Sequence, residues 1–371
     1  MSTTGIIVEF NPFHNGHAAH ISETKKRTGC KHIIAVMSGN FVQRGEPAIF
    51  DKWQRTKTAL TQGVDIVIEI PMPYVIAGAD YFARASVKLL EATGVVDTLS
   101  FGSESGNLDE IKAAAGVLAK EPQLYKETLR KGLDAGLSFA VAKGDALAAC
   151  LGKVSDGLLI KPNNGLAIEY CKALKLLDSS MQVITTHRTP GGPSATKIRR
   201  ELAEQGRVVT LDDFSDIFKY LLYTNEKVVT NLSEGLGNRL QRMCGEFSKI
   251  SDLLQAAKTK RYTYTRLQRT VLGMVLGVSS RDMEEYDRHG GVQYIRVLGF
   301  RKEAAGLVGE ITRRATLPVI TTGADIDKIL HGGGLAAKML ASELTAGDVY
   351  RVASNTSGGH HSERKVGVVV C

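Results

Sequence analysis

Short runs of β-branched and other apolar residues recur along the first half of this 371-residue chain, and they restrict its fold more than any other feature. Five runs suit buried strands: residues 5–8, 33–37, 65–70, 98–102 and 181–185. Segments with helical spacing lie between them, at residues 18–26, 53–62, 79–93 and 166–177. Continuous apolar strands that alternate with helices are typical of a parallel sheet covered on both faces. We therefore predict an α/β domain with a Rossmann-like parallel sheet over residues 1–210, with ligands bound where the strands end.

The pattern changes near Leu211. Helical spacing is found at residues 214–223, 236–247, 250–258, 264–276 and 283–289, and only residues 295–298 resemble a strand. Proline, which disrupts helices, is absent between Val209 and Leu317. We predict a mostly helical second domain over residues 211–371, with a tail in which Gly332–Gly334 and Gly358–Gly359 form flexible joints.

Composition excludes several classes of protein. No run of 18 apolar residues is present, and Met1–Ile6 lacks the basic start and apolar stretch of a secretory signal. The five cysteines are scattered and never spaced as CxxC, which argues against a disulfide framework or a zinc cluster and for a reducing cytoplasm. The formal net charge of +8, from 47 Lys and Arg against 39 Asp and Glu, is compatible with a polyanionic partner.

A strand-to-helix connection carries the strongest chemical signal. Residues 6–8 (IIV) lead into residues 9–17 (EFNPFHNGH), and a helix follows. His14 and His17 are three residues apart, so both rings point towards the start of that helix, where free amides and the helix dipole favour phosphate. The alternatives are a zinc pair, which lacks a nearby third ligand, and two ordinary loop histidines. We favour phosphate binding.

A second motif lies at residues 194–199 (SATKIR), at a predicted helix start. Ser194 or Thr196 can cap the helix, while Lys197 and Arg199 can neutralise the charge of a phosphate group. By itself this motif is also typical of an ordinary capped surface helix.

Other candidates follow the remaining strands and each has two interpretations. Gly102 is either a turn glycine or a point of close approach to adenine or ribose. Asn163 either caps a helix or, as the family resemblance given below implies, contacts the nucleotide, and Arg188 is a surface charge or, as we favour, a nucleotide ligand. Gln43, Arg44 and Lys52 either order the loop after the second strand or hold acetate or RNA.

A basic segment lies within the predicted helical domain. Residues 258–269 contain five cations and two tyrosines without an acid: Lys258, Lys260, Arg261, Tyr262, Tyr264, Arg266 and Arg269. The cations can neutralise phosphates and the tyrosines can stack on unpaired bases, so we favour RNA binding over a solvated helix face.

The HxGH arrangement and the 194–199 motif resemble those of the HxGH nucleotidyltransferase superfamily. The wider chain, from residue 5 to about residue 300, resembles the bacterial tRNA(Met) cytidine acetate ligase family. The resemblance rests on residues 8–17 (VEFNPFHNGH), 37–47 (MSGNFVQRGEP), 101–104 (FGSE), 161–164 (KPNN) and 258–269 (KTKRYTYTRLQR). Departures are Phe10, where the family often has Tyr, Gly165 and Ala167, where it tends to have a bulky aliphatic residue and a glycine, and a tail after about Leu317 without a match.

The resemblance implies an enzyme that forms acetyl-adenylate from acetate and ATP with Mg²⁺, then acetylates the wobble cytidine of elongator tRNA(Met) to N4-acetylcytidine. It implies catalytic roles for His14, His17, Lys197 and Arg199. The expected nucleotide contacts are Ile7, Val8, Glu9, Phe10, Asn11, Pro12, Phe13, His14, Asn15, Gly16, His17, Ala18, Ala19, His20, Gly102, Asn163, Arg188, Ser194 and Thr196. Alternative functions are a small-metabolite adenylyltransferase and a non-catalytic RNA-binding protein.

Overall fold

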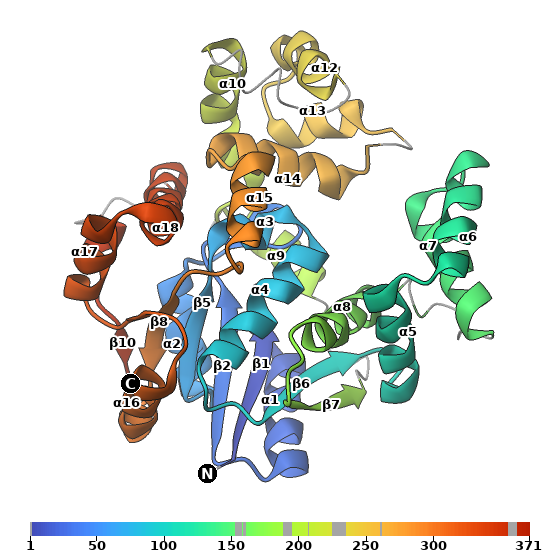
Figure 1. The fold of residues 1–371 in the computed structure, drawn as a ribbon. Helices are drawn as coiled ribbons and strands as arrows, with labels where there is room; N and C mark the ends of the chain where they lie inside the picture. Colours follow the sequence, from blue (N-terminus) through green and yellow to red (C-terminus); the bar gives the residue numbers. More distant parts are fainter. Residues whose placement is uncertain are drawn as a thin grey trace.

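The computed structural model describes residues 2–152, 158, 161–187, 195–206, 208–224, 235–259, 262–354 and 362–371. A mostly parallel eight-stranded sheet lies at its centre (Figure 1), in the order β10-β8-β5-β2-β1-β6-β7 with β9 paired to β8. The strands are β1 Thr3–Val8, β2 His32–Ser38, β5 Ile66–Ile70, β6 Thr98–Ser103, β7 Gln182–His187, β8 Ile295–Phe300, β9 Val319–Ile320 and β10 Val369–Val370. A short hairpin of β3 Phe41–Val42 and β4 Glu46–Pro47 follows β2. All five strands predicted for the first half are confirmed.

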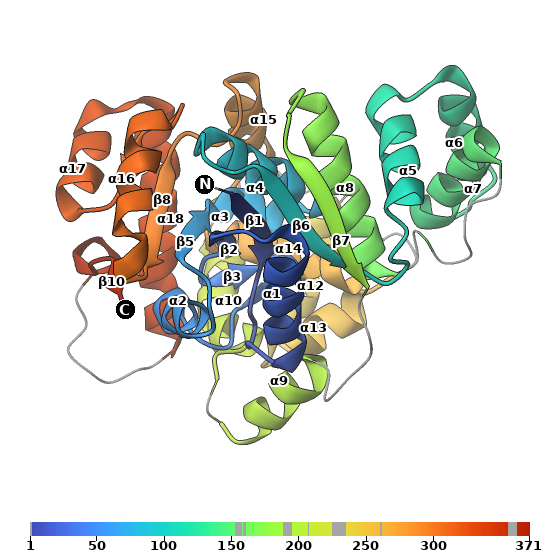
Figure 2. The same cartoon turned by 90° about the horizontal axis from the view of Figure 1, so that it is seen from below.

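Helices connect these strands as the apolar spacing predicted. The four predicted helices are α1 Asn15–Thr28, α2 Lys52–Thr61, α4 Ala79–Ala92 and α8 Pro162–Leu176. The structure adds α3 Met72–Ala77, α5 Leu108–Lys120, α6 Gln123–Asp134 and α7 Phe139–Leu151. The α6–α7 pair projects from one side of the molecule (Figure 2).

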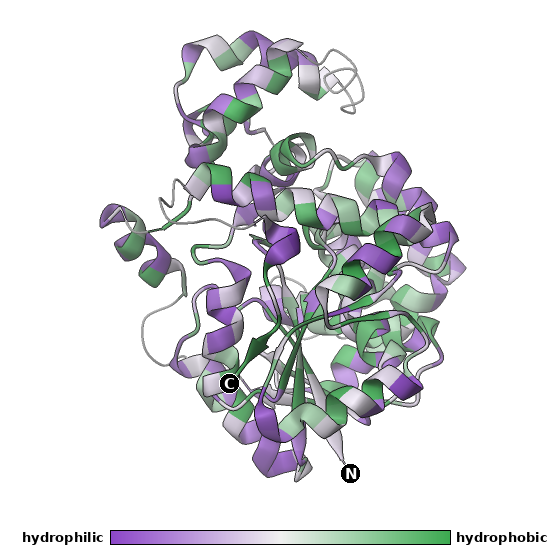
Figure 3. Ribbon diagram, turned by 90° about the vertical axis from the view of Figure 1, so that its left-hand side faces the viewer, coloured by the Kyte–Doolittle hydropathy of each residue, from purple (hydrophilic) through white to green (hydrophobic). Residues whose placement is uncertain are grey.

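Alternation along β2 divides its buried side chains between the two faces of the sheet. Ile33, Ala35 and Met37 belong to the core under α1 and α2, whereas Ile34 and Val36 belong to the core under α4 and α8. Successive side chains of a strand point to opposite faces, so a strand covered on both sides is apolar throughout. Figure 3 shows this as green strands at the centre of the ribbon.

The chain after residue 211 also contributes to this sheet. β8 runs antiparallel to β5, with Glu69 opposite Arg296, and β10 pairs with β8. The parallel sheet is therefore confirmed for β1, β2, β5, β6 and β7, and it gains an antiparallel strand at the β5 edge. The sequence indicated a strand near residue 295 but not its place, because an apolar run carries no information on its partner. The domain division at residue 210 stays a prediction.

The second half is mostly helical, as predicted. Its helices are α9 Ala195–Glu204, α10 Ser215–Thr224, α12 Leu236–Met243, α13 Ile250–Ala257, α14 Tyr264–Val275, α15 Ser280–Arg288, α16 Ala305–Arg314, α17 Gly323–Gly332 and α18 Gly334–Ser354. In Figure 1, α10, α12, α13 and α14 lie beyond the ends of β1 and β2. None of the helices that the structure describes is long and apolar enough to cross a membrane. All five cysteines are free thiols.

The tail differs from its expectation. Gly332–Gly334 forms a corner between α17 and α18, in which Gly333 and Gly334 have positive φ angles of 69° and 70°. This conformation is easy for glycine and costly for other residues, so the glycines set a turn between two helices. Gly358 and Gly359 lie outside the described residues.

Candidate active site at the start of α1

The amino-terminal end of α1 carries both histidines of the HxGH motif. His14 is the N-cap residue of α1, and its Nδ1 accepts a hydrogen bond from the Gly16 amide at 3.0 Å. One turn later, His17 Nδ1 accepts the His14 amide at 3.3 Å. The two rings are stacked, with centroids 3.8 Å apart and an interplanar angle of 22°. The pair thus forms a capping box, a role more often filled by Ser or Thr with Glu.

These hydrogen bonds fix the tautomer of both imidazoles. When Nδ1 of a neutral imidazole accepts a hydrogen bond, the proton is on Nε2. Both Nε2 atoms are therefore donors, at a helix terminus whose amides and dipole favour an anion. Among the described residues, no three His, Cys, Asp or Glu side chains gather in a way that could hold a metal ion. The arrangement suits phosphate oxygens better than zinc.

A buried arginine holds the loop between β1 and α1. Arg55 of α2 is 2% exposed, and its Nη1 donates to the Glu9 carbonyl at 2.6 Å. Its Nε donates to the Phe50 carbonyl at 3.0 Å, and its Nη2 donates to the Gly39 carbonyl. One guanidinium thus joins the ends of β1 and β2. The sequence analysis missed Arg55, because an arginine in a helix is usually a surface charge.

Aromatic packing completes this support. Phe10 is 1% exposed and lies edge-on to the His17 ring, with centroids 5.0 Å apart. Its φ of 47° turns the chain sharply after β1. Phe13 packs on Phe10 at 4.9 Å, so both phenyl rings limit the orientation of His17. Phe10, which has no hydroxyl group, contacts His17 and Phe13 only through its apolar ring.

Arg199 connects the second motif to the HxGH loop. Its Nη1 donates to the Asn11 carbonyl at 3.0 Å and its Nη2 to Thr196 Oγ1 at 3.3 Å. Lys197 is 59% exposed and lies 3.8 Å from Glu201 of its own helix, so its contact with a phosphate stays a prediction. Arg188 and Ser194 lie outside the described residues.

Gly102 and Asn163 lie on neighbouring elements beside β1. Gly102 is in β6, opposite Thr186 of β7, and His20 of α1 is 2.8 Å from that threonine hydroxyl. Asn163 is in the first turn of α8, where its Nδ2 donates to Glu104 Oε1 at 2.6 Å. Glu104 also accepts the Asn163 and Asn164 amides, so the carboxylate of Glu104, more than Asn163, caps α8. A nucleotide contact for Gly102 and for Asn163 stays a prediction.

Glu9 is the acidic group at the end of β1. Its Oε1 accepts the Gln43 amide at 2.7 Å. Burial raises the pKa of Glu9 above its ordinary value, while that amide and the charges of Arg55, Arg44 and Arg199 oppose the rise. The charges of arginines from three separate segments therefore act on a single carboxyl group beside the HxGH loop.

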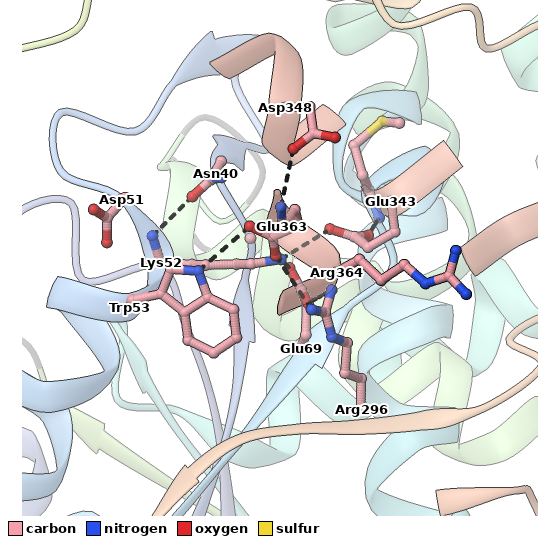
Figure 4. Close-up of polar contacts among 12 residues, drawn as sticks. Asn40, Asp51, Lys52, Trp53, Glu69, Arg296, Glu343, Asp348, Glu363 and Arg364 are labelled. Atoms are coloured by element: carbon pink, nitrogen blue, oxygen red, sulfur yellow. Dashed lines mark hydrogen bonds and ion pairs between the residues drawn. The ribbon is translucent and has the colours of Figure 1, made fainter. Parts of the chain in front are cut away.

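Lys52 is buried in an ion cluster with Glu69, Arg296, Glu343 and Glu363, here called the Lys52 cluster (Figure 4). The Lys52 Nζ is 2.6 Å from Glu69, 2.5 Å from Glu363 and 3.6 Å from Glu343. The Arg296 guanidinium is 3.1 Å from Glu69 and 3.2 Å from Glu363. These distances answer the question left open for Lys52, which orders the structure and is not available to acetate or RNA.

The charges of the Lys52 cluster balance if one acid is neutral. Three carboxyl groups face two cations, and burial together with Glu69 raises the pKa of Glu343 well above its ordinary value. Glu69, which contacts both cations, has a lowered pKa. Glu343 is therefore the acid of the Lys52 cluster whose raised pKa most favours the neutral form. Its Oε2 accepts the Met72 amide at 2.5 Å, which attaches α18 to α3.

The predicted RNA-binding segment is divided between a loop and α14. Tyr262 is 8% exposed, and the Arg266 guanidinium lies over its ring at 5.3 Å. Lys258 caps the end of α13, while Tyr264 and Arg269 are half-buried on α14. Lys260 and Arg261 lie outside the described residues. Base stacking by these tyrosines and phosphate contacts by these cations stay predictions.

Comparison with known proteins decides the family. A model described as HIGH Nucleotidyl Transferase matches residues 1–205 and 192–365. A tRNA(Met) cytidine acetate ligase of Thermoanaerobacter sp. (strain X514) is 36% identical, with 96% of each chain covered. That of Caldanaerobacter subterraneus subsp. tengcongensis is 37% identical over 95% of this chain and 96% of the relative. The chain belongs to the tRNA(Met) cytidine acetate ligase family.

Solved structures agree with membership of this ligase family. A crystal structure of Thermotoga maritima TmcAL bound with alpha-thio ATP has a TM-score of 0.91 and 29% identity, covering 100% of this chain and 99% of the other. The apo form of that protein gives the same TM-score with 28% identity. The resemblance recognised in the motifs is confirmed. It continues past Leu317, where the sequence motifs gave no match, because the alignments cover almost the whole chain.

Proposed function

We propose that this chain activates acetate with ATP as acetyl-adenylate and transfers the acetyl group to the wobble cytidine of elongator tRNA(Met), giving N4-acetylcytidine. The observation that carries the proposal is the pair of Nε2 donors of His14 and His17 at the start of α1, with Arg199 hydrogen-bonded to the same loop. The names of the relatives and the alpha-thio ATP bound to the Thermotoga maritima protein support it. We place the reaction in the cytoplasm.

In the first step a carboxylate oxygen of acetate attacks the α-phosphorus of ATP, and the bond to the β-phosphate oxygen breaks to release pyrophosphate. Negative charge grows on the α-phosphate oxygens and on the leaving group. His14 and His17 would donate to the former, while Lys197 and Arg199 would neutralise the latter. These donors are held before ATP arrives, because each histidine is fixed by a backbone amide.

Mg²⁺ is expected to enter with ATP. The described residues offer no cluster of three or more potential metal-binding side chains, so the protein part of the site does not form a metal cage. Mg²⁺ commonly takes its ligands from substrate phosphates and water.

In the second step the exocyclic amine of cytidine attacks the acetyl carbonyl, the bond to the AMP phosphate oxygen breaks, and the amine loses a proton. Acetyl-adenylate is already activated, so the protein mainly positions the base. The base must leave its stack to reach the site. We assign the nucleotide site to residues 1–210 and tRNA binding chiefly to residues 211–371.

The test measures the two steps of the reaction separately, acetate activation by pyrophosphate exchange and acetyl transfer by the modified nucleoside. Incubation with ATP, acetate and labelled pyrophosphate should give acetate-dependent label in ATP. Addition of an elongator tRNA(Met) transcript should give N4-acetylcytidine, measured by mass spectrometry of its nucleosides. Exchange that depends on another acid would indicate an adenylyltransferase of a different substrate, and tRNA binding without any exchange would indicate a non-catalytic RNA-binding protein. Either result would refute the proposal.

A further inference from the structure

The β3–β4 hairpin contacts both the candidate active site and α14. At one end, the Gln43 amide donates to Glu9 at 2.7 Å. At the other, Gln268 of α14 donates to Glu46 Oε1 at 2.8 Å. Gly45 has a φ of 82°, and a Cβ added to it would lie 2.5 Å from the Arg269 nitrogen. The tip of the hairpin therefore lies directly against the backbone of α14, beside Arg269.

Two arginines flank this contact, Arg44 next to Gly45 and Arg269 on α14, while the Glu46 carboxylate beside them accepts a hydrogen bond from Gln268. Arg44 is exposed at the tip of the hairpin, and Arg269 is half-buried next to it. Within the part of the chain that the structure describes, neither guanidinium has an ion pair or hydrogen bond. Burial and the charge of Arg266 both lower the pKa of Arg269, and no carboxyl group opposes them. A half-buried cation beside another cation is unfavourable unless an anion binds it.

The position of this pair favours RNA over ATP as the source of that anion. The triphosphate already has its own proposed cations, Lys197 and Arg199 of α9. Arg44 lies near the active site, since it follows Gln43, whose amide donates to Glu9 at 2.7 Å, whereas Arg269 belongs to α14 in the basic segment. A base that is turned into a pocket leaves the phosphates on either side of it at the mouth of that pocket. The hairpin and α14 offer cations at such a place.

We propose that Arg44 and Arg269, with Arg266 beside them, form an anion site for the backbone phosphates that flank the nucleotide to be acetylated. This inference rests on the proposed function and deepens it. It joins Arg44, for which the sequence analysis left loop ordering and the binding of acetate or RNA open, to a basic segment more distant in the chain. The site takes phosphodiester groups and reads no base, so it positions the RNA strand while the catalytic pocket selects the cytidine.

The experiment compares Arg44→Gln and Arg269→Gln with the parent and with Arg130→Gln. Arg130 is a suitable control, because its side chain is 85% exposed on the projecting α6. Its ion pair with Asp134 of the same helix, at 3.7 Å, is long and exposed to solvent. Each site variant should bind an elongator tRNA(Met) transcript roughly tenfold more weakly, the scale of one lost charge-assisted contact. The slope of log affinity against log salt should fall by about 0.7 to 0.9 per variant. The control should keep the affinity and slope of the parent.

Two further measurements separate a loss of RNA contacts from a loss of catalysis or of folding. Acetate-dependent pyrophosphate exchange should fall much less than tRNA binding, and an equal fall would show that these arginines bind ATP or acetate and overturn the inference. Arg269→Gln should melt at or above the parent temperature, since it removes a half-buried charge that has no acidic partner. Unchanged tRNA affinity and slope in both variants would also overturn it. If the parent binds tRNA through these arginines but performs no exchange, the proposed function fails and the phosphate site stands.

Discussion

Replacement of His17 by Asn is expected to lower acetate-dependent pyrophosphate exchange by about 10²-fold or more, the usual effect of removing one transition-state donor. The Asn side-chain oxygen can take the place of Nδ1 and accept the His14 amide, which His17 accepts at 3.3 Å in the parent. The substitution then removes mainly the Nε2 donor and keeps the start of α1. Exchange assays with purified variants, accompanied by thermal melts, measure both effects.

His331→Asn is the matched control for this substitution. His331 also lies at a helix end and bonds to backbone through Nδ1, 2.7 Å from the Asp327 carbonyl, but it is exposed on α17. Its variant should exchange pyrophosphate as the parent does. Transfer from chemically prepared acetyl-adenylate should suffer less than exchange in His17→Asn, because the α-phosphate step has been bypassed. Normal exchange in a folded His17→Asn protein would exclude His17 from the first step.

The second large effect concerns stability. Lys52→Met should reduce the free energy of unfolding by about 3–5 kcal/mol, because it leaves Glu69 and Glu363 buried without their closest cation. Lys338→Met is the matched control: Lys338 also lies 2.8 Å from two carboxylates, Asp282 and Glu285, but its side chain is 47% exposed. Exposed pairs contribute roughly 0–1 kcal/mol. Denaturant unfolding of the parent, Lys52→Met and Lys338→Met should show a much larger loss of unfolding free energy for Lys52→Met than for Lys338→Met. Equal small losses in the two variants would show that the charge of Lys52 is not critical for stability.

Glu343→Gln tests the charge balance of the same cluster. If Glu343 is protonated in the folded protein, a neutral glutamine should change the unfolding free energy at neutral pH by less than about 1 kcal/mol. The raised pKa of Glu343 means that its contribution is greatest in acid and declines as pH rises above its ordinary value of 4.5. The variant should therefore lose less stability than the parent between pH 4 and pH 7. A variant that is several kcal/mol less stable at neutral pH would mean that Glu343 is ionised.

The sequence revealed those parts of the site that are contiguous in the chain. The HxGH loop is a strand, a turn and a helix start within fifteen residues, so local spacing and helix capping were enough to locate it. Arg199 could be linked to it only through the family resemblance, because nothing local indicates that its guanidinium reaches the Asn11 carbonyl. Arg55 was missed for the same reason.

The Lys52 cluster shows where sequence reasoning ends. Its members come from α2, β5, β8, α18 and the short 3-10 helix that begins at Glu363. In the sequence, each of these charged residues taken alone resembles an ordinary solvated surface residue. Only the pairing of β8 with β5 and the packing of α18 on α3 bring them together. Such long-range contacts depend on the whole fold, and charge patterns in one segment do not encode them.

The late arrival of β8 has a consequence for the newly made chain on the ribosome. Until residues 295–300 have been synthesised, β5 is an open sheet edge with the sequence Ile-Val-Ile-Glu-Ile, a composition prone to aggregation. An inward-facing charge is one of the means by which proteins protect such edges from mispairing. Glu69 supplies that charge, and Arg296, which lies opposite it in the finished sheet, joins Lys52 as its second cation. The Glu69 carboxylate thus discourages foreign strands during translation, and its ion pair with Arg296 favours the correct register of β8 when that strand emerges.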